Sequence, residues 1–397
     1  AGVTQKTLSK ATRQALNLLP MINEWISPSI INKFAWPTWV NALKDAHEPK
    51  NINHITFDSP NRLRLAYDEM LAHQLTLAIA RENYRKSKGI KNIGNKSLSK
   101  KVMEFIPFEL TNAQKRVIEE IRNDMSQPFR MNRLLQGDVG SGKTLIAFLC
   151  MVTAIEAGGQ AVIMAPTEIL TKQHEDTLKP LAEKAGIVLE SLSGRDKGKE
   201  RKSKIEAIAT GKIQIIVGTH AVFQESIKYN DLRLAIIDEQ HRFGVRQRMD
   251  LGNKGDAVDI LIMTATPIPR SLALTNYGDM ELSEVDEKPI GRKPINTVMV
   301  SSSRILEVID RLKVAIETGN QIYWVCPLVE ESEFLELTSA EDRANNLSKV
   351  LGKNNIGLVH GKMSGEEKDR VMSDFVENKI KILVATTVIE VGVNVPN

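Results

Sequence analysis

Short apolar runs alternate with helix-length segments over most of the chain, and this alternation limits the folds it can adopt. In the first series the runs predicted to be strands are 132–136, 160–165, 213–218, 233–238 and 259–264. A second series begins near Pro294, with runs at 295–300, 321–326, 356–360 and 380–385. Strands separated by helices are typical of a parallel sheet with crossover helices. The sequence therefore predicts two α/β units in tandem, joined by a hinge at 287–294.

Residues 1–103 lack this alternation and are predicted to be mostly helical. Residues 63–85 carry apolar side chains on one helical face, namely Met70, Leu71, Leu75, Ala78 and Ile79. Residues 25–39 contain two prolines among several aromatic side chains, which predicts irregular packing. Residues 86–97 are basic and contain two glycines, as is typical of a loop or linker. We therefore expect a domain boundary near Val102.

The net charge of +4 is unevenly distributed along the chain. Residues 1–103 hold 16 Lys and Arg against 7 Asp and Glu, so the remainder is mildly acidic. The densest basic stretch is 81–101, where eight basic residues are opposed only by Glu82. Two interpretations are equally supported: a solvated linker, or an arm that contacts nucleic-acid phosphates.

Composition excludes several classes of protein. Apolar residues make up 42% of the chain, which argues against extensive disorder. The longest apolar run, 145–155, is shorter than the roughly 20 residues of a membrane span, so we expect a buried helix and no membrane association. Cys150 and Cys326 are far apart and lie in apolar runs. This excludes a disulfide framework or a Cys-based zinc site and predicts buried thiols in a reducing cytoplasm.

The sequence GDVGSGKT at 137–144 fits the phosphate-loop pattern G-x-x-x-x-G-K-[ST]. An apolar strand candidate precedes it and the apolar helix 145–155 follows, which is the context such a loop requires. The glycines let backbone N–H groups surround a phosphate, and the helix N-terminus favours an anion. We expect Lys143 to reach the β- and γ-phosphates of ATP and the Thr144 hydroxyl to bind Mg²⁺. The predicted loop residues are Gly137, Gly140, Ser141, Gly142, Lys143 and Thr144.

Two carboxylates follow a later buried strand. The apolar run before Asp238 ends in Asp238 and Glu239. Asp238 is expected to hold Mg²⁺, directly or through water, and Glu239 to orient and deprotonate the attacking water. Gln240 and His241 come next and complete the predicted catalytic group.

Polar side chains also follow the next predicted strand, at Thr264 and Thr266. Adjacent parallel strands end in the same crevice, so these hydroxyls are expected beside the γ-phosphate. There they would couple the nucleotide state to a second site. A simpler interpretation of Thr264 and Thr266 is a capped turn before Pro267.

The motifs, taken together, resemble the core of superfamily-two helicases. More narrowly, the chain is similar to the bacterial RecG family of ATP-dependent DNA helicases. The resemblance rests on RLLQGDVGSGKTLIA, IIDEQHRFGVRQR, IMTATPIPRSLALT, YWVCPLVEESE and LVATTVIEVGVNVPN. It is strong over 104–397 and looser over 1–103, around YDEMLAHQLTLAIAR.

The resemblance implies two tandem RecA-like lobes, at 104–290 and 291–397, after the end of a wedge region with connecting helices at 1–103. It implies that Gln114 reads the adenine edge and that Phe108 stacks on the base. It also implies that Gly392 faces both nucleotide and DNA. Asn394 stands where many relatives have Asp, so it is given no charge-dependent role.

The resemblance further implies contacts with the DNA sugar-phosphate backbone at strand ends. The matching positions are Pro166, Thr167, Thr219 and His220 in the first lobe, and His360, Gly361, Thr386 and Thr387 in the second. The charged segment 194–199 is equally consistent with phosphate contacts and with a solvated loop.

The family's arginine-rich motif is expected after Asn397, and most of the wedge domain is expected before Ala1. The chain is therefore expected to be an internal fragment with a truncated second lobe. For the whole protein the resemblance implies ATP hydrolysis coupled to remodelling of branched DNA, such as stalled forks and Holliday junctions, in recombination and repair. A cytoplasmic bacterial monomer is expected, with single-strand-binding protein as a candidate partner.

Two alternatives stay open beside this expectation. One is a transcription-repair coupling translocase, which has a similar motor and an HRFGV-like segment. YWVCPLVEESE, the EQH sequence after Asp238 and the lack of a recognisable polymerase-binding module favour the RecG resemblance. The other is that the fragment binds ATP and DNA with little turnover, because the transition-state arginines are missing.

Overall fold

The structure is a computed structural model of the 397-residue chain. It describes residues 4–20, 22–86, 88–194, 196, 198–224, 226–238, 257–265, 280–289, 295–326 and 333–386. The chain divides into two compact units, of which the first contains the residues up to Lys86 and the second begins at Ser87. The unit boundary therefore lies upstream of the expected boundary near Val102.

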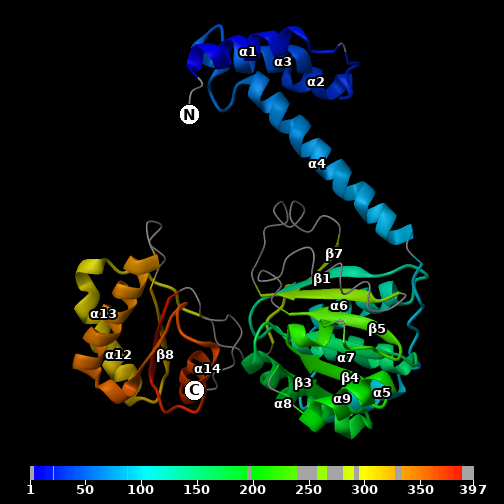
Figure 1. The fold of residues 1–397 in the computed structure, drawn as a ribbon, viewed down its shortest axis with the longest axis vertical. Helices are drawn as coiled ribbons and strands as arrows, with labels where there is room; N and C mark the ends of the chain where they lie inside the picture. Colours follow the sequence, from blue (N-terminus) through cyan, green and yellow to red (C-terminus); the bar gives the residue numbers. More distant parts are fainter. Residues whose placement is uncertain are drawn as a thin grey trace. The chain divides into compact units, whose positions relative to one another are not determined.

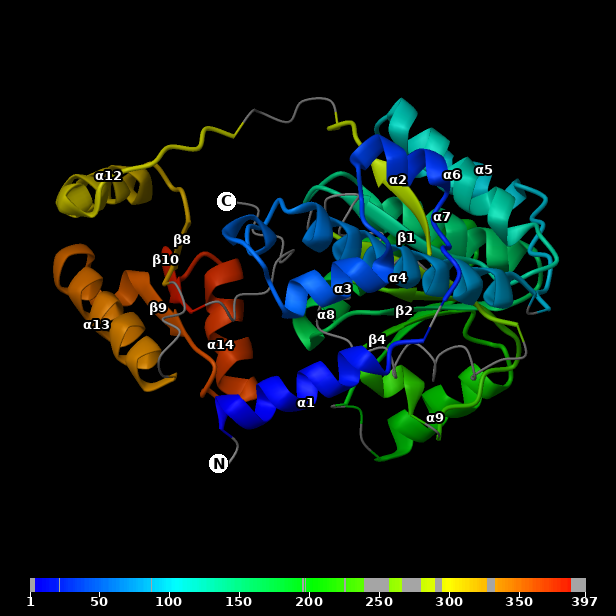
Figure 2. The same ribbon diagram turned by 90° about the horizontal axis from the view of Figure 1, so that it is seen from above.

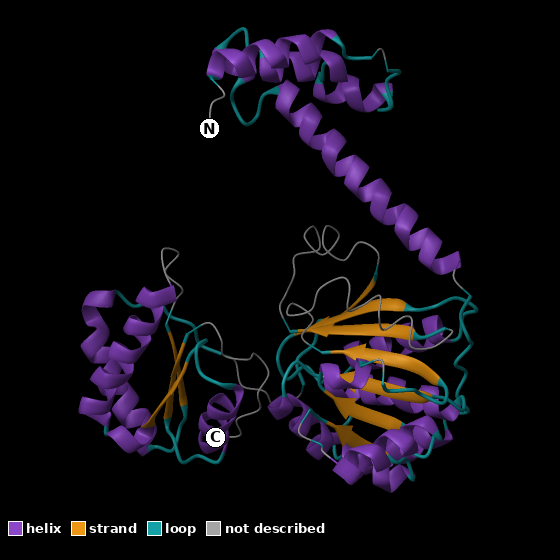
Figure 3. Ribbon diagram, in the orientation of Figure 1, coloured by secondary structure: helices purple, strands orange, loops and turns teal. Residues whose placement is uncertain are grey.

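The first unit is helical in the residues described, as the sequence predicted (Figure 3). Its helices are α1 (Gln5–Asn17), α2 (Pro28–Phe34), α3 (Trp39–His47), the short η1 (Ile52–His54) and the long α4 (Pro60–Lys86). The prediction of irregular structure over 25–39 was wrong for α2. Pro28 occupies the first helical turn, where its missing N–H leaves no hydrogen bond unmade. The α4 prediction is confirmed, although Met70, Leu75 and Ile79 are about half exposed.

A buried arginine joins the elements of this unit. The Arg64 side chain on α4 is fully buried and forms ion pairs with Glu24 at 2.8 Å and Asp68 at 3.0 Å. It also donates to the Pro37 carbonyl oxygen at 3.2 Å. The hydrogen bond from Arg64 lowers the pKa of the Glu24 carboxyl. Because a buried charge is costly unless paired, this network fixes α4 against the segments before α2 and α3.

The first lobe is built on a seven-stranded parallel sheet with strand order β3-β4-β2-β5-β6-β1-β7 (Figure 1). The strands are β1 (Asn132–Gly137), β2 (Gln160–Met164), β3 (Leu189–Leu192), β4 (Ile215–Gly218), β5 (Leu232–Ile237), β6 (Asp259–Thr264) and β7 (Glu281–Val285). Five of these match predicted strands. The two edge strands, β3 and β7, were missed because their sequences, LESL and ELSEV, mix polar with apolar side chains.

The core of this lobe lies between the sheet and four helices, α5 (Ser97–Phe105), α6 (Asn112–Met125), α7 (Lys143–Glu156) and α8 (Glu168–Ala185). Helix α7 carries the predicted apolar run, and residues 146–155 are all buried. Val102 on α5 is fully buried in the same core, so α5 belongs to this lobe. A further helix, α9 (Gly198–Ala209), and the short η2 (His220–Phe223) complete the described elements of the lobe.

The basic linker docks on this lobe through a buried carboxylate. Gly89 and Asn92 donate backbone N–H groups to Pro128 and Met125. The Asp259 side chain, at the start of β6, accepts from the Asn92 amide at 2.8 Å and from the Met131 backbone N–H at 2.7 Å. This part of the linker is therefore packed against the lobe.

Asp259 makes stability depend on pH, because burial raises the pKa of its carboxyl to about 7. A folded-state pKa above the ordinary value means that the native state holds the proton more tightly than the unfolded chain. The stability that Asp259 contributes is therefore full below its ordinary pKa of 3.8 and is lost as the pH rises from there to about 7. Between pH 5 and pH 8 we expect the unfolding free energy of the wild type to fall by roughly 2–4 kcal/mol. The melting temperature should drop over the same interval. The Asp259→Asn variant should lose less unfolding free energy over this pH interval. The control variant Asp176→Asn, at an exposed site, should lose as much as the wild type. Equal losses in all three would contradict this.

The second lobe has a three-stranded parallel sheet with order β8-β10-β9, formed by β8 (Ile322–Val325), β9 (Ile356–Val359) and β10 (Ile382–Ala385). Its helices are α12 (Ile305–Glu317), α13 (Glu333–Leu351) and α14 (Gly365–Val376), with short turns η4 (Ser302–Arg304) and η5 (Lys353–Asn355). Alternate residues of β10 face opposite layers: Ile382 and Val384 pack with α12 and α13, and Leu383 and Ala385 with α14 (Figure 2).

The prediction of a strand at 295–300 was wrong. These residues have no strand partner, and Ile295, Val298 and Met299 are largely exposed. Their apolar alternation is strand-like, but pairing depends on a neighbouring strand that sequence pattern cannot supply. Cys150 and Cys326 are free and buried, as predicted. Among the described helices none is long and apolar enough to cross a membrane.

Candidate functional site

The carboxyl ends of the first lobe's parallel strands bring the predicted site residues to one edge of the sheet. Thr219 follows β4, Pro166 and Thr167 follow β2, Asp238 follows β5, and the 137–144 loop follows β1. In strand order, the positions expected to contact DNA therefore lie at β4 and β2, and those expected to contact ATP lie at β5, β6 and β1. Ligands of open parallel sheets bind at this edge.

The 137–144 loop has the geometry of an anion cradle. Helix α7 begins at Lys143, and its N-cap, Gly142, has a left-handed φ of +91° and no side chain to cap the helix. A Cβ at Gly142 would lie 2.4 Å from the Gln114 amide nitrogen, so this position requires glycine. The Ser141 hydroxyl is buried without a hydrogen-bond partner. Uncapped helix N–H groups and an unpartnered buried hydroxyl fit a bound phosphate.

Lys143 folds back onto the loop. Its ammonium group donates to the carbonyl oxygens of Gly137 at 2.7 Å and Asp138 at 3.1 Å. Two of its contacts are thus with carbonyl oxygens of the phosphate loop itself. Thr144 follows in the first turn of α7 and is half-buried, which fits its expected role as a magnesium ligand.

Gln114 is part of the support of this loop. Its amide nitrogen donates to the Ser141 carbonyl at 2.8 Å, and its amide oxygen accepts from the Thr111 backbone N–H at 2.9 Å. Thr111 and Gln114 form the capping box that starts α6, a pattern visible in the sequence as T-x-x-Q. Gln114 is buried and its bond to Ser141 ties it to the phosphate loop, while its expected contact with the adenine edge stays a prediction. Phe108 is 57% exposed and accessible for base stacking.

Asp238 is buried at the end of β5 beside a histidine. Its Oδ2 lies 2.8 Å from His174 Nε2, and both residues are buried. The Asp238 backbone N–H donates to the Met164 carbonyl at 2.8 Å. An acceptor-only carboxylate with a fixed orientation suits a divalent cation. Sequence reasoning missed His174, since a lone histidine on an amphipathic helix gives no local signal.

Thr264 at the end of β6 stands in register with Gln136 of β1, and both are buried. Gln136 was also missed, although its amide oxygen is buried without a partner at the base of the phosphate loop. The placement of Thr264 next to β1 is consistent with its expected coupling role.

The positions of the first lobe that are expected to contact DNA lie at helix starts. Thr167 caps α8, and Thr219 precedes η2 with its side chain buried. His220 is exposed and Pro166 is half-buried. A helix N-terminus at a strand end attracts phosphate, so the α8 start can hold a DNA backbone.

In the second lobe, His360 follows β9 and Thr386 follows the adjacent strand β10. The Thr386 N–H donates to the Val359 carbonyl at 3.3 Å, and His360 Nδ1 is buried without a partner. Gly361 is exposed, and its carbonyl accepts from Lys368 at 3.1 Å. The structure therefore brings His360 and Thr386 to one sheet edge.

Several predicted residues lie outside the described part of the chain. They are Glu239, Gln240, His241, Thr266, Thr387, Gly392 and Asn394. Of the charged segment 194–199, Arg195 and Lys197 also lie outside it. Their roles remain predictions.

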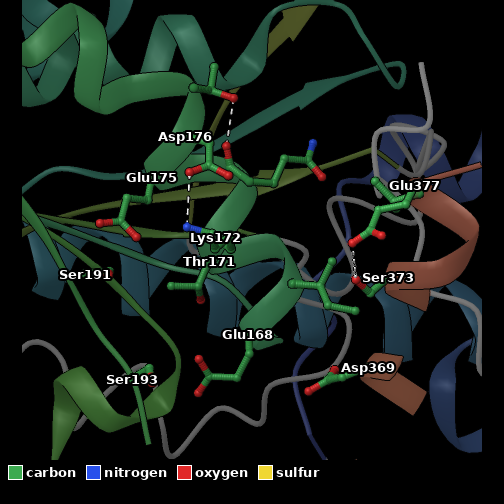
Figure 4. A pocket seen from close by; sticks show the side chains of 14 residues that line it. Glu168, Thr171, Lys172, Glu175, Asp176, Ser191, Ser193, Asp369, Ser373 and Glu377 are labelled. Carbon is green, nitrogen blue, oxygen red and sulfur yellow. Dashed lines mark hydrogen bonds and ion pairs between the residues drawn. The ribbon is translucent and has the colours of Figure 1, made fainter. Parts of the chain in front are cut away.

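A cavity of about 770 Å³ adjoins α8 on the face shown in Figure 4. The first lobe lines it with Glu168, Glu175 and Asp176, the last paired with Lys172 at 3.4 Å. Because these carboxylates repel phosphate, the cavity is unfavourable for a nucleotide.

Comparison with known proteins decides the family. Residues 111–275 match the DEAD/DEAH box helicase domain, and residues 304–397 match the helicase conserved C-terminal domain. The ATP-dependent DNA helicase RecG of Escherichia coli (strain K12) is 46% identical over 407 residues, and that of Bacillus subtilis (strain 168) is 44% identical over 399. Both alignments cover 100% of this chain and 58% of the relative. The chain belongs to the RecG family.

A solved structure of RecG bound to a three-way DNA junction superposes with a TM-score of 0.78 at 40% identity. The superposed region covers 100% of this chain and 52% of the RecG chain in that structure. The RecG similarity thus includes residues 1–103, where sequence motifs alone showed only a loose resemblance. The DEAD-box helicase Mss116 bound to single-stranded RNA, with a TM-score of 0.57 at 18% identity, shares the fold. The chain spans about 58% of the length of its RecG relatives.

Proposed function

We propose that this chain is the motor part of an ATP-dependent DNA helicase that remodels branched DNA, including stalled forks and Holliday junctions. The observation that carries the proposal is the arrangement of the first sheet. One edge presents a phosphate cradle at β1, a buried carboxylate at β5 and a helix N-terminus at β2. A RecG relative solved on a three-way junction supports branched DNA as the substrate class.

The residues of the first lobe would hold ATP and Mg²⁺ as follows. The α7 N-terminus and Lys143 bind the phosphates, and Gln114 keeps the loop in shape. The Thr144 hydroxyl and the Asp238 carboxylate hold Mg²⁺, which neutralises phosphate charge when bound. Glu239 orients and deprotonates water for attack on the γ-phosphate. Thr264, Thr266 and Gly392 are proposed to couple the nucleotide state to DNA.

DNA is proposed to bind through its backbone, at the start of α8 and η2 in the first lobe and at His360 and Thr386 in the second. Such contacts read little base sequence, and affinity should fall steeply with salt. Opening and closing between lobes, driven by loss of the γ-phosphate, would move the grip along the strand. We also propose a cytoplasmic monomer, with single-strand-binding protein as a candidate partner.

The 397-residue chain should bind ATP and a three-way junction but hydrolyse ATP slowly. The reason is that the chain spans about 58% of the length of its RecG relatives, and the resemblance implies an arginine-rich motif outside this span. Transition-state arginines contribute about 10³–10⁵-fold to turnover in related phosphoryl transfer. The measurement is junction-stimulated ATPase of this chain beside a version extended through that motif. Equal turnover by the two proteins would contradict the expectation.

A further inference from the structure

His174 contacts the proposed magnesium ligand. Its Nε2 lies 2.8 Å from Asp238 Oδ2, and the two side chains are 7% and 11% exposed. An ionised carboxylate can only accept a hydrogen bond, so Nε2 carries the proton and donates. With Oδ2 engaged in this way, Oδ1 remains the oxygen for the cation.

The backbone of Asp238 forms a second link to the β2–α8 segment, which carries His174. Its N–H donates to the Met164 carbonyl at 2.8 Å, and Met164 is the last residue of β2. Strand β2 leads through Pro166 into α8, which carries His174. The β2–α8 unit therefore holds Asp238 by its main chain and by its side chain.

Helix α8 also begins at a proposed DNA contact. Thr167 caps the helix, its hydroxyl accepting from Leu170 N–H at 3.5 Å and its carbonyl accepting from the Thr171 hydroxyl at 3.0 Å. Leu170, Thr171, His174 and Leu178 are all buried on one face. His174 lies seven residues after Thr167, about two helical turns or 10 Å along the axis. Because that face is packed, movement at the helix start is transmitted to His174.

We propose that His174 is a positioning residue that sets the orientation of the Asp238 carboxylate and makes magnesium binding depend on DNA contact at the start of α8. The inference rests on the proposed function, because it assigns Asp238 to the cation and Thr167 to DNA. A purely structural His–Asp pair would support folding, and cation affinity would then be independent of DNA. Thermodynamic linkage requires the reciprocal effect, so nucleotide with cation must change DNA affinity by the same factor.

The test compares three substitutions in the 397-residue chain. His174→Met removes the donor at similar volume, His174→Gln keeps an N–H at similar reach, and Thr177→Ala is the control. Thr177 is exposed on α8, and among the described residues its hydroxyl donates to the Gln173 carbonyl of its own helix. Mn²⁺ affinity is measured by electron paramagnetic resonance with a non-hydrolysable ATP analogue, with and without a three-way junction. Melting temperatures report folding.

We expect the junction to change Mn²⁺ affinity in the wild type and in Thr177→Ala. His174→Met should weaken Mn²⁺ binding about 10-fold, the usual effect of losing a partner of a metal ligand, and should lose the junction effect. His174→Gln should retain most of the Mn²⁺ affinity and most of the junction effect. If the Met variant does not fold, His174→Asn, whose amide is too short to reach Asp238, takes its place.

Two outcomes would overturn the role of His174. One is a Met or Asn variant with wild-type affinity and junction effect, and the other is a Gln variant as impaired as the Met or Asn variant. If the wild type itself binds neither Mn²⁺ with nucleotide nor the junction, the proposed function fails instead.

Discussion

Lys143→Ala is expected to abolish ATP-driven activity of the full-length protein. The ammonium group donates to the Gly137 carbonyl of the same loop at 2.7 Å, and it is proposed to meet the β- and γ-phosphates. Removing one charge-assisted contact to the phosphates should weaken ATP binding by about 10–100-fold. Loss of the same charge from the transition state should lower turnover by about 10²–10³-fold.

Fluorescent-nucleotide titration and steady-state ATPase would measure these two effects. Lys115→Ala is a matched control, because Lys115 is an exposed lysine on α6 away from the loop. Its ATP affinity and turnover should equal those of the wild type. Wild-type ATP affinity in the Lys143 variant would remove the 137–144 loop from the nucleotide site.

Glu239→Gln is expected to separate binding from turnover. Glu239 directly follows the buried Asp238 in the sequence, and it is proposed to orient and deprotonate the attacking water. The amide keeps the size of the side chain but cannot accept the proton, and loss of a general base costs about 10²–10⁴-fold. ATP affinity should stay within about twofold of the wild type, because no phosphate contact is removed.

Single-turnover hydrolysis, measured beside nucleotide binding, distinguishes this base from a binding residue. A Glu239→Gln variant that hydrolyses ATP at the wild-type rate would show that another group activates the water. A variant that loses ATP affinity would instead show that Glu239 supports the site structurally.

The sequence predicted the central strands of the first lobe's sheet but not its two edge strands. Strands β2, β4 and β6 are buried throughout, and most of their residues are apolar. Edge strands β3 and β7 expose polar side chains and have no such pattern. The opposite error occurred at 295–300, where an apolar pattern has no partner strand in the structure.

Local motifs found the phosphate loop and Asp238, because these functions need defined residues at fixed spacing along the chain. Contacts between distant segments could not be predicted in this way. The pair of His174 with Asp238 joins residues 64 apart, and the pair of Asn92 with Asp259 joins residues 167 apart. Gln114 is an intermediate case, since its T-x-x-Q capping box is visible in the sequence but its bond to Ser141 is not.

The most direct test of the account is dissociation of a three-way DNA junction by the full-length protein, followed with and without ATP and beside the Lys143→Ala and Glu239→Gln variants. The account predicts ATP-dependent dissociation by the wild type, none by either variant, and junction binding by all three proteins. Dissociation that proceeds without ATP, or that survives in either variant, would contradict it.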